Sequence, residues 1–344
     1  MVLAEVAIKE NESSGGDVAS SFKEFADANL DSSSAASIVA GISIFTNACI
    51  LVFELNCAGD VGSSMLGGAL DPTICMFGFA AVLGALPITQ SKENVSKVSS
   101  MIVMALFASF FGLLVPGLAN VQDPVGTFFS PGTCESGISD TAPIILMSMV
   151  YQNIVPTVTK ILDYDRDKSF AAIALGSFLP LCLYLAWSFA CIGGGVDMNA
   201  VGASGALMTV FSVTATIGSS IGCAMAIPEE VGFFLPSNDK SNDEDNNGLA
   251  NPVAVAVGVG IPAAIAYMFA GGDDLTMAFK IAGSYGTPLL YGVIPAAMAW
   301  TQRKRLEDIP NLVPGGVATL AGLGVASMGL VMQELSIDVG AFLS

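Results

Sequence analysis

The chain has 344 residues, of which 53% are hydrophobic and only 12% are charged, and its formal net charge is −18. Soluble domains carry about 25% charged residues, so the charges here are too few to cover a water-facing surface, and we expect the surface to face lipid. With only 12 basic residues in all, the chain also lacks the clustered Lys and Arg that bind a nucleic acid backbone.

Residues 1–36 come first and are polar enough to predict a cytoplasmic or stromal segment, with a short amphipathic helix near 18–30. The transmembrane domain follows over 37–333, and residues 334–344 form a tail. A helix needs about 20 apolar residues to cross a bilayer. Nine runs meet this length, at about 37–56, 72–90, 98–119, 141–159, 169–193, 204–228, 252–271, 281–300 and 313–333.

The basic residues in the loops support this count of nine spans. Cytoplasmic loops of membrane proteins collect Lys and Arg, so the loops between real spans should alternate in basic content. One predicted side holds 11 of the 12 basic residues, and the other side holds only Lys280, at the mouth of a span. Adding or removing one span would destroy this alternation. The basic side is therefore expected to be cytoplasmic, or stromal in a plastid.

The fourth apolar run contains an unusual polar stretch, MSMVYQNIVPTVTKIL, at 147–162. Tyr151, Gln152 and Asn153 lie side by side, and Pro156 removes a backbone donor and clashes with the carbonyl four residues earlier. Transporters interrupt helices in this way near the middle of the membrane, where freed backbone groups hold substrate and ions. The alternative is a proline-kinked helix whose polar side chains satisfy its own backbone.

Other polar residues lie within the predicted spans. The first span contains Thr46, Asn47 and Glu54, and an acid inside a span is a candidate for binding a proton or a cation. Glu54 could instead reach water at the membrane interface. The sixth span carries a run of hydroxyl groups at 212–222 that includes Thr214 and Ser219. Its small residues could also serve only close helix packing.

Catalysis and metal binding receive little support from the sequence. Seven cysteines form no Cys-x-x-Cys pair, and the chain has no histidine. We therefore predict no disulfide framework, no metal site and no cofactor. The short motifs of phosphate-binding loops, metalloproteases and serine hydrolases do not occur. An enzyme is the least supported class.

The order Tyr-Gln-Asn-Ile-Val-Pro-Thr from Tyr151 to Thr157 is followed by a span that carries Gly176, Ser177, Pro180, Leu181, Tyr184 and Trp187. In residue type and spacing, this region resembles the aromatic amino acid permeases, which are the tryptophan/tyrosine permeases of bacteria and their plant and algal plastid relatives. Weaker similarity covers essentially the whole chain, including 283–300.

The resemblance implies an all-α integral membrane protein with a LeuT/APC-like inverted-repeat fold, in which 141–300 forms the second five-helix repeat. It also implies secondary transport of tyrosine or tryptophan coupled to protons, in the plasma membrane or a plastid envelope. The implied partners are the lipid bilayer, the amino acid and protons. Substrate would contact Ser148, Tyr151, Gln152, Asn153 and Pro156, with walls from Thr46, Asn47, Thr214 and Ser219.

Two features differ from the family pattern. The family has two more helices than the nine predicted here, and the sequence MVLAEV at 1–6 resembles the end of the family's second helix. The resemblance therefore implies either an N-terminally truncated form that lacks the first two helices, or a diverged form. The family carries a histidine where this chain has Gln152, which cannot titrate, so Glu54 becomes the candidate for ion coupling. Two other functions remain open: a transporter of another neutral amino acid, and a transport-inactive membrane protein or fragment that binds or senses.

Overall fold

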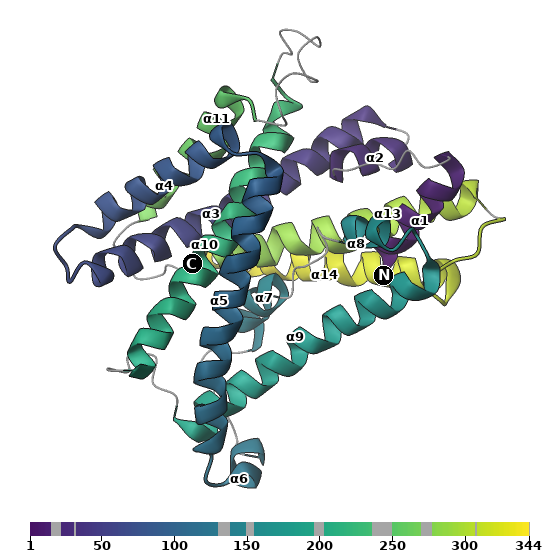
Figure 1. Ribbon diagram of the computed structural model, residues 1–344. Coiled ribbons are helices and arrows are strands. Elements are labelled where there is room, and N and C mark those ends of the chain that lie inside the picture. The colour runs from purple at the N-terminus through teal and green to yellow at the C-terminus, as the bar shows by residue number, and fades with distance from the viewer. Residues whose placement is uncertain are drawn as a thin grey trace. The chain divides into compact units, whose positions relative to one another are not determined.

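The computed structural model describes residues 1–14, 22–30, 32–129, 138–148, 155–195, 203–235, 250–269, 277–306 and 308–343. The residues described form helices joined by turns and contain no β-strand (Figure 1). The prediction of an all-α protein is confirmed for this part of the chain.

The helices differ widely in length, from five residues in α12 to 33 residues in α3. In chain order they are α1 (Val2–Ser14), α2 (Phe22–Leu30), α3 (Ser33–Met65), α4 (Pro72–Thr89), α5 (Lys92–Ala119), α6 (Pro124–Phe129), α7 (Ile138–Ser148), α8 (Val155–Ile161), α9 (Arg166–Gly194), α10 (Ala203–Gly232), α11 (Pro252–Phe269), α12 (Met277–Ile281), the π-helices η2 (Ala282–Gly286) and η3 (Leu289–Val293), α13 (Ile294–Arg305) and α14 (Gly316–Leu343).

Local sequence explains where two of the spans begin. Before α4, the Asp71 side chain accepts a hydrogen bond from the Thr73 N–H, and Pro72 occupies the first helical turn. Before α5, the Ser91 hydroxyl caps the helix through the Asn94 N–H. Both are the usual N-terminal signals, because these groups satisfy donors that the first turn leaves without a partner.

Among the residues described, seven helices are long and apolar enough to cross a membrane. They are α3, α4, α5, α9, α10, α11 and α14, and each coincides with a predicted apolar run. The run 141–159 is covered by α7 and α8, while 149–154 lie outside the residues described. The run 281–300 combines α12, η2, η3 and α13. A total of nine spans therefore stays a prediction.

The chain divides into two compact units. Unit 1 comprises Met1–Thr46, Ser136–Phe178 and Phe279–Ser344, and unit 2 comprises Asn47–Glu135 and Leu179–Ala278. The division falls within α3, α9 and α12, so each of these helices contributes to both units.

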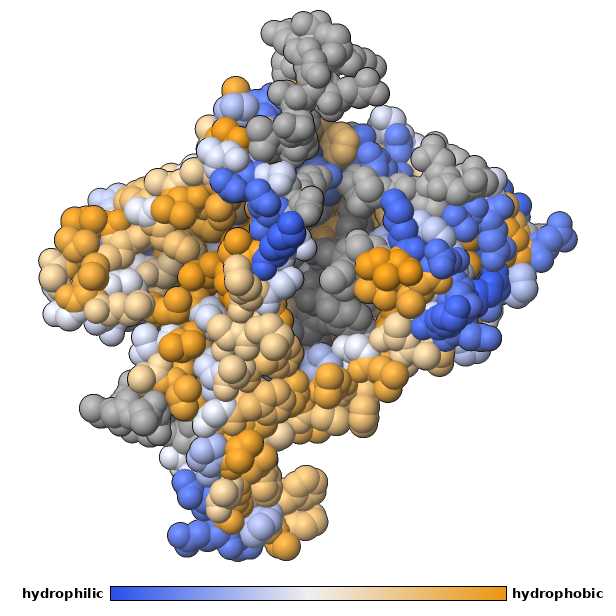
Figure 2. Space-filling model, viewed as in Figure 1, coloured by the Kyte–Doolittle hydropathy of each residue, from blue (hydrophilic) through white to orange (hydrophobic). Residues whose placement is uncertain are grey.

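Many large apolar side chains are exposed on the spans. On α4, Ile74 and Val82 expose 59% and 61% of their surface, and on α9 Leu175 exposes 68%. Figure 2 shows hydrophobic residues covering the visible surfaces of α4 and of α9. Surfaces of this extent on a soluble protein would drive association, whereas in a bilayer they contact lipid.

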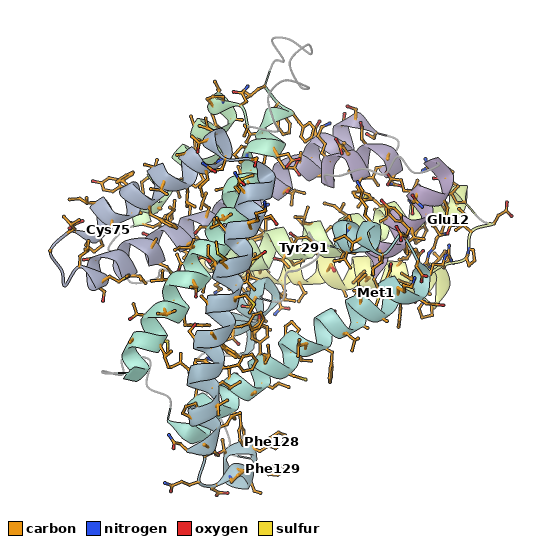
Figure 3. All side chains as sticks on the ribbon, in the orientation of Figure 1. Met1, Glu12, Cys75, Phe128, Phe129 and Tyr291 are labelled. Carbon is orange, nitrogen blue, oxygen red and sulfur yellow. The ribbon has the colours of Figure 1, made fainter. Side chains whose placement is uncertain are left out.

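An aromatic pair extends from the short helix α6 in unit 2. Phe128 and Phe129 are 73% and 75% exposed, with ring centroids 5.2 Å apart (Figure 3). The predicted topology places α6 in a loop on the side opposite the basic loops. We expect these apolar rings to contact lipid on that side rather than water.

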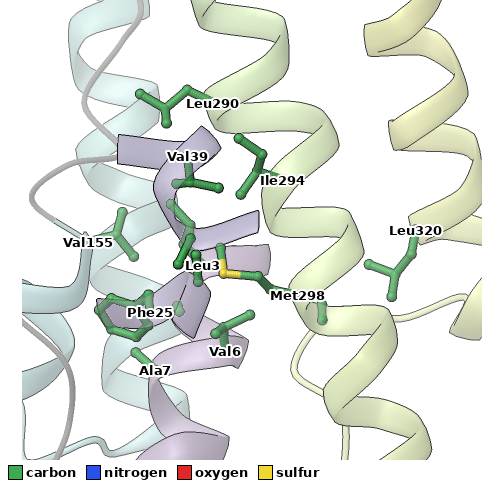
Figure 4. Packing of buried hydrophobic residues seen from close by; sticks show 14 of the residues in the cluster. Leu3, Val6, Ala7, Phe25, Val39, Val155, Leu290, Ile294, Met298 and Leu320 are labelled. Carbon is green, nitrogen blue, oxygen red and sulfur yellow. The ribbon is translucent and has the colours of Figure 1, made fainter. Parts of the chain in front are cut away.

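The core of unit 1 is built around α1, which packs against segments from the other end of the chain. Apolar residues of α1 recur at Leu3, Val6 and Ala7, the spacing of one helix face. They share one buried cluster with Phe25 of α2, Ile294 and Met298 of α13, and Leu320 of α14 (Figure 4). The sequence predicted a short helix at α2, and the family resemblance predicted helix only for the first residues of α1.

Charged and polar side chains of α1 are also buried, and each has a partner in unit 1. Glu5 forms an ion pair with Arg303 at 2.6 Å between Oε1 and Nε. The Lys9 Nζ donates to Asn311 Oδ1 at 2.8 Å. Burial lowers the pKa of Lys9, and the negative charge of Glu5 acts in the opposite direction. The orientation of 1–36 toward the cytoplasm stays a prediction.

A buried amide network extends this interface to α2. The Gln302 Nε2 donates to the Val6 carbonyl at 3.0 Å and to Asn29 Oδ1 at 2.6 Å. The Asn29 Nδ2 in turn donates to Glu10 Oε2 at 3.0 Å. Because buried polar groups are costly unless paired, this network specifies how α1 and α2 dock on α13.

Candidate functional site

The predicted polar stretch of the fourth run is only partly visible. Tyr151, Gln152 and Asn153 lie outside the residues described. Ser148 is the last residue of α7, and its Oγ donates to the Ile144 carbonyl at 2.7 Å. Pro156 lies in the first turn of α8. The assignment of these residues to a substrate site therefore stays a prediction.

The helix α7 lies directly against the π-helix η2 in unit 1. Gly283 permits this contact, because a Cβ atom there would overlap the Pro143 carbonyl oxygen. One turn further on, the Thr287 Oγ1 lies 3.2 Å from Met147 Sδ. The element that packs against α7, η2, is a π-helix, so the regular α-helical hydrogen-bonding pattern is interrupted there. π-Helical turns are frequent at functional sites.

Thr46, a predicted wall residue, lies on the α3 part of unit 1 and is completely buried. Its Oγ1 donates to the Ile42 carbonyl at 2.8 Å. A Cβ atom at Gly286 would overlap the Thr46 side chain, so η2 also lies against α3. Unit 1 therefore brings Thr46, η2 and α7 into one packed region.

Glu54 is the centre of a polar cluster in unit 2, formed by α3 and α10. Its side chain is only 9% exposed, and the hydroxyls of Thr216 and Ser219 hydrogen-bond to it. On the same two helices, the Cys223 Sγ lies 3.9 Å from Asn47 Oδ1. Three of the residues singled out in the sequence, Asn47, Glu54 and Ser219, thus share one cluster.

Two further hydroxyls on α10 differ in how they are satisfied. The Thr214 Oγ1 donates within its own helix, to the carbonyls of Val210 and Phe211 at 2.7 and 3.0 Å. The Ser220 Oγ is buried and has no hydrogen-bond partner among the residues described. Sequence analysis did not single out Ser220, because the run 212–222 contains several small residues that look alike.

The residues described contain no group of three or more Cys, Asp or Glu that could hold a metal ion. What the geometry offers is buried hydroxyl, amide and carboxyl groups within apolar helices. Such groups can bind and orient a small polar molecule or a proton.

A search against models of protein families matches this chain over residues 1–206 and 196–333. The model describes the tryptophan/tyrosine permease family. The chain belongs to this family.

One relative among the characterised permeases is the tyrosine-specific transport system 1 of Haemophilus influenzae. The two sequences are 20% identical over 330 residues, which cover 87% of this chain and 76% of the relative.

Membership confirms the resemblance deduced from the sequence. The permease is a multi-pass membrane protein, and its family comprises transporters rather than enzymes. The predicted site residues are distributed over both units, with Ser148, Pro156 and Thr46 in unit 1, and Asn47, Glu54, Thr214 and Ser219 in unit 2.

Proposed function

We propose that this permease is a secondary active transporter of an aromatic amino acid, tyrosine or tryptophan. The family match over most of the chain carries this proposal. The printed name of the bacterial relative adds support for tyrosine. The exposed apolar surfaces of seven helices suit a protein that works within a bilayer.

The proposed fold is a LeuT/APC-like inverted repeat with nine spans in this chain. Support comes from the alternating basic loops and from the apolar run 281–300, which is not a single regular α-helix. In transporters, interrupted helices line the substrate site. We assign substrate binding to Ser148, Tyr151, Gln152, Asn153 and Pro156, and we add Thr46, Asn47, Thr214 and Ser219 as further candidate contact residues.

We also propose that transport is coupled to protons through Glu54. Its hydrogen-bonding neighbours are the hydroxyls of Thr216 and Ser219. A hydroxyl can donate to a carboxylate and can accept from a carboxylic acid. These neighbours can therefore hydrogen-bond to Glu54 in both of its protonation states. A protonated lysine or arginine could not accept a hydrogen bond from the neutral acid. Gln152 has no titrating group, so it cannot take this role.

Uptake by proteoliposomes tests the function directly. The purified chain is reconstituted, the external buffer is made more acidic than the lumen, and labelled tyrosine, tryptophan and leucine are supplied in turn. We expect tyrosine or tryptophan to accumulate, and a protonophore to abolish the accumulation. Equal uptake of leucine would identify a broader neutral amino acid permease. Saturable binding without uptake of any of the three would identify a transport-inactive binding protein.

A further inference from the structure

A cavity of about 390 Å³ lies within unit 1 between α7, η2 and α14. Its lining includes Ala142 and Leu146 of α7, Ser284 of η2, and Leu330, Gln333 and Glu334 of α14. None of these residues belongs to the proposed transport site. Ligand pockets in proteins have volumes of roughly 300–1,000 Å³, so a small organic molecule fits here.

One end of the cavity carries a buried acid next to a base. Glu334 is only 8% exposed, and its Oε1 lies 3.8 Å from Lys280 Nζ. Charge-assisted hydrogen bonds between such groups are about 2.7–2.9 Å long, so the two charges are close without a tight hydrogen bond. A carboxylate offers about four acceptor positions, which leaves Glu334 able to bind a second cation.

The hydroxyl of Ser284 is an independent sign of a ligand. Ser284 lines the cavity and is 4% exposed, and its Oγ has no hydrogen-bond partner among the residues described. Buried polar groups are nearly always paired, because an unpaired one loses its hydration without compensation. A ligand atom that pairs with this hydroxyl would therefore gain affinity. The residue also lies in a π-helix, a feature frequent at functional sites.

The predicted topology places this cavity on the non-cytoplasmic side of the membrane. The loop before α7, the loop before α12 and the C-terminal end of α14 all lie on the side that is poor in Lys and Arg. The cavity is thus on the side opposite the basic loops, and it shares α7 with the proposed transport site.

We propose that this cavity is a second binding site, for a zwitterionic amino acid with an apolar or aromatic side chain. Its ammonium pairs with Glu334, and its carboxylate accepts from the Ser284 hydroxyl near the positive charge of Lys280. Its side chain contacts Ala142, Leu146 and Leu330. That the bound amino acid is also the transported one rests on the proposed function. The existence of the site does not.

Binding of labelled tyrosine and tryptophan to the purified full chain tests the proposal. Nanodiscs made only of phosphatidylglycerol remove lipid ammonium groups as competing ligands. We expect Glu334→Gln to weaken one binding component by about ten- to a hundredfold, since a hydrogen bond to a charged group contributes that much. Leu330→Trp should remove the same component by filling the cavity. The matched control is Ser336→Ala, whose hydroxyl bonds only its own helix, to the Gln333 carbonyl.

Competitors identify the chemical class of the ligand. Tyramine lacks the carboxylate and 3-(4-hydroxyphenyl)propionate lacks the ammonium, so each should displace this component at least about tenfold less well than tyrosine. Displacement by tyramine as strong as by tyrosine would overturn the zwitterion assignment. Identical binding curves for the parent chain, Glu334→Gln and Leu330→Trp would overturn the site itself.

A second measurement does not depend on the loss of binding. Ala142→Cys places a thiol in the cavity wall, and tyrosine should slow its reaction with a membrane-impermeant thiol reagent. The parent chain, treated identically, gives the background from the native cysteines. Absence of protection would contradict the proposal. Cavity binding without uptake in proteoliposomes would refute only the transport function, and uptake with binding insensitive to Glu334→Gln would refute only the cavity site.

Discussion

Replacing Glu5 by glutamine removes the negative charge opposite Arg303 while keeping the size of the side chain. The two residues are 1% and 8% exposed. The carboxylate accepts from Arg303 Nε at 2.6 Å and Nη2 at 2.8 Å. It also accepts from the Val313 N–H at 2.8 Å. A glutamine has a single acceptor oxygen, so it cannot serve the donors on both sides, and the guanidinium loses its counter-charge.

The expected cost follows from the burial of this pair. Removing one partner of a buried ion pair destabilises a protein by about 3–5 kcal/mol. Arg303 keeps its hydrogen bonds to the Gly316 and Val313 carbonyls, at 2.6 and 3.0 Å, which offsets part of the loss. We therefore expect a loss of about 3 kcal/mol in the free energy of unfolding. A shift of about 2–4 °C per kcal/mol in large domains converts this to a fall in Tm of roughly 6–12 °C.

The assay is thermal unfolding of the purified protein in detergent, followed by the fraction that remains monodisperse. Glu12→Gln is the matched control in the same helix. Glu12 pairs with Arg166 at 3.0 Å, but the pair is exposed to solvent, with side-chain exposures of 40% and 26%. Such surface pairs contribute about 0–1 kcal/mol, so the control should lower Tm by less than about 4 °C.

A double substitution decides whether the pair itself is responsible. If Glu5 and Arg303 stabilise the fold through each other, Glu5→Gln combined with Arg303→Gln should destabilise less than the sum of the two single changes. Equal falls in Tm for Glu5→Gln and Glu12→Gln, or strict additivity in the double variant, would refute the reasoning.

Three further predictions concern packing and coupling. Gly283→Ala should lower both Tm and uptake, because the added methyl group would overlap the α7 backbone. The control Gly329→Ala meets no neighbouring atom, so it should leave stability unchanged or raise it by up to about 1 kcal/mol. Glu54→Gln should abolish proton-driven accumulation while exchange of labelled for unlabelled substrate persists, and Asp60→Asn, exposed on the same helix, should preserve both. Phe25→Ala should cost about 3–5 kcal/mol in chemical denaturation, as expected for an aromatic side chain that is 2% exposed.

Apolar helices could be predicted from the sequence because hydropathy is a local property. The runs at 37–56 and 169–193 correspond to α3 and α9. The helix α3 extends beyond its run by several residues at both ends, and α9 does so mainly at its N-terminal end. Most of the helix α1 could not be predicted, for the opposite reason. Glu5 and Lys9 marked 1–36 as polar, but their partners Arg303 and Asn311 lie 298 and 302 residues away in the sequence. A hydropathy window cannot detect compensation over that separation.

The candidate site was predictable by residue type but not by arrangement. Glu54 and Ser219 were both singled out as polar residues within spans, yet nothing in the sequence indicated that one hydrogen-bonds to the other. The cavity beside Ser284 was missed altogether. Its walls come from helices far apart in the chain, and the glycines of η2 give no local sign of the backbone contact that Gly283 permits.

The two π-helices change the rotational phase of the span that contains them. A π turn closes over one more residue than an α turn, and one residue advances an α-helix by roughly 100°. Residues after η3, including Gln302 and Arg303, therefore point in directions that an uninterrupted α-helix would not give them. Deleting one residue from Ala282–Gly286 would remove one of the two π turns and leave a span of nearly the same hydropathy that presents a different face to α1. The sequence of this span therefore determines the rotation of its residues about the helix axis as well as the length of the span. Hydropathy reveals only the length.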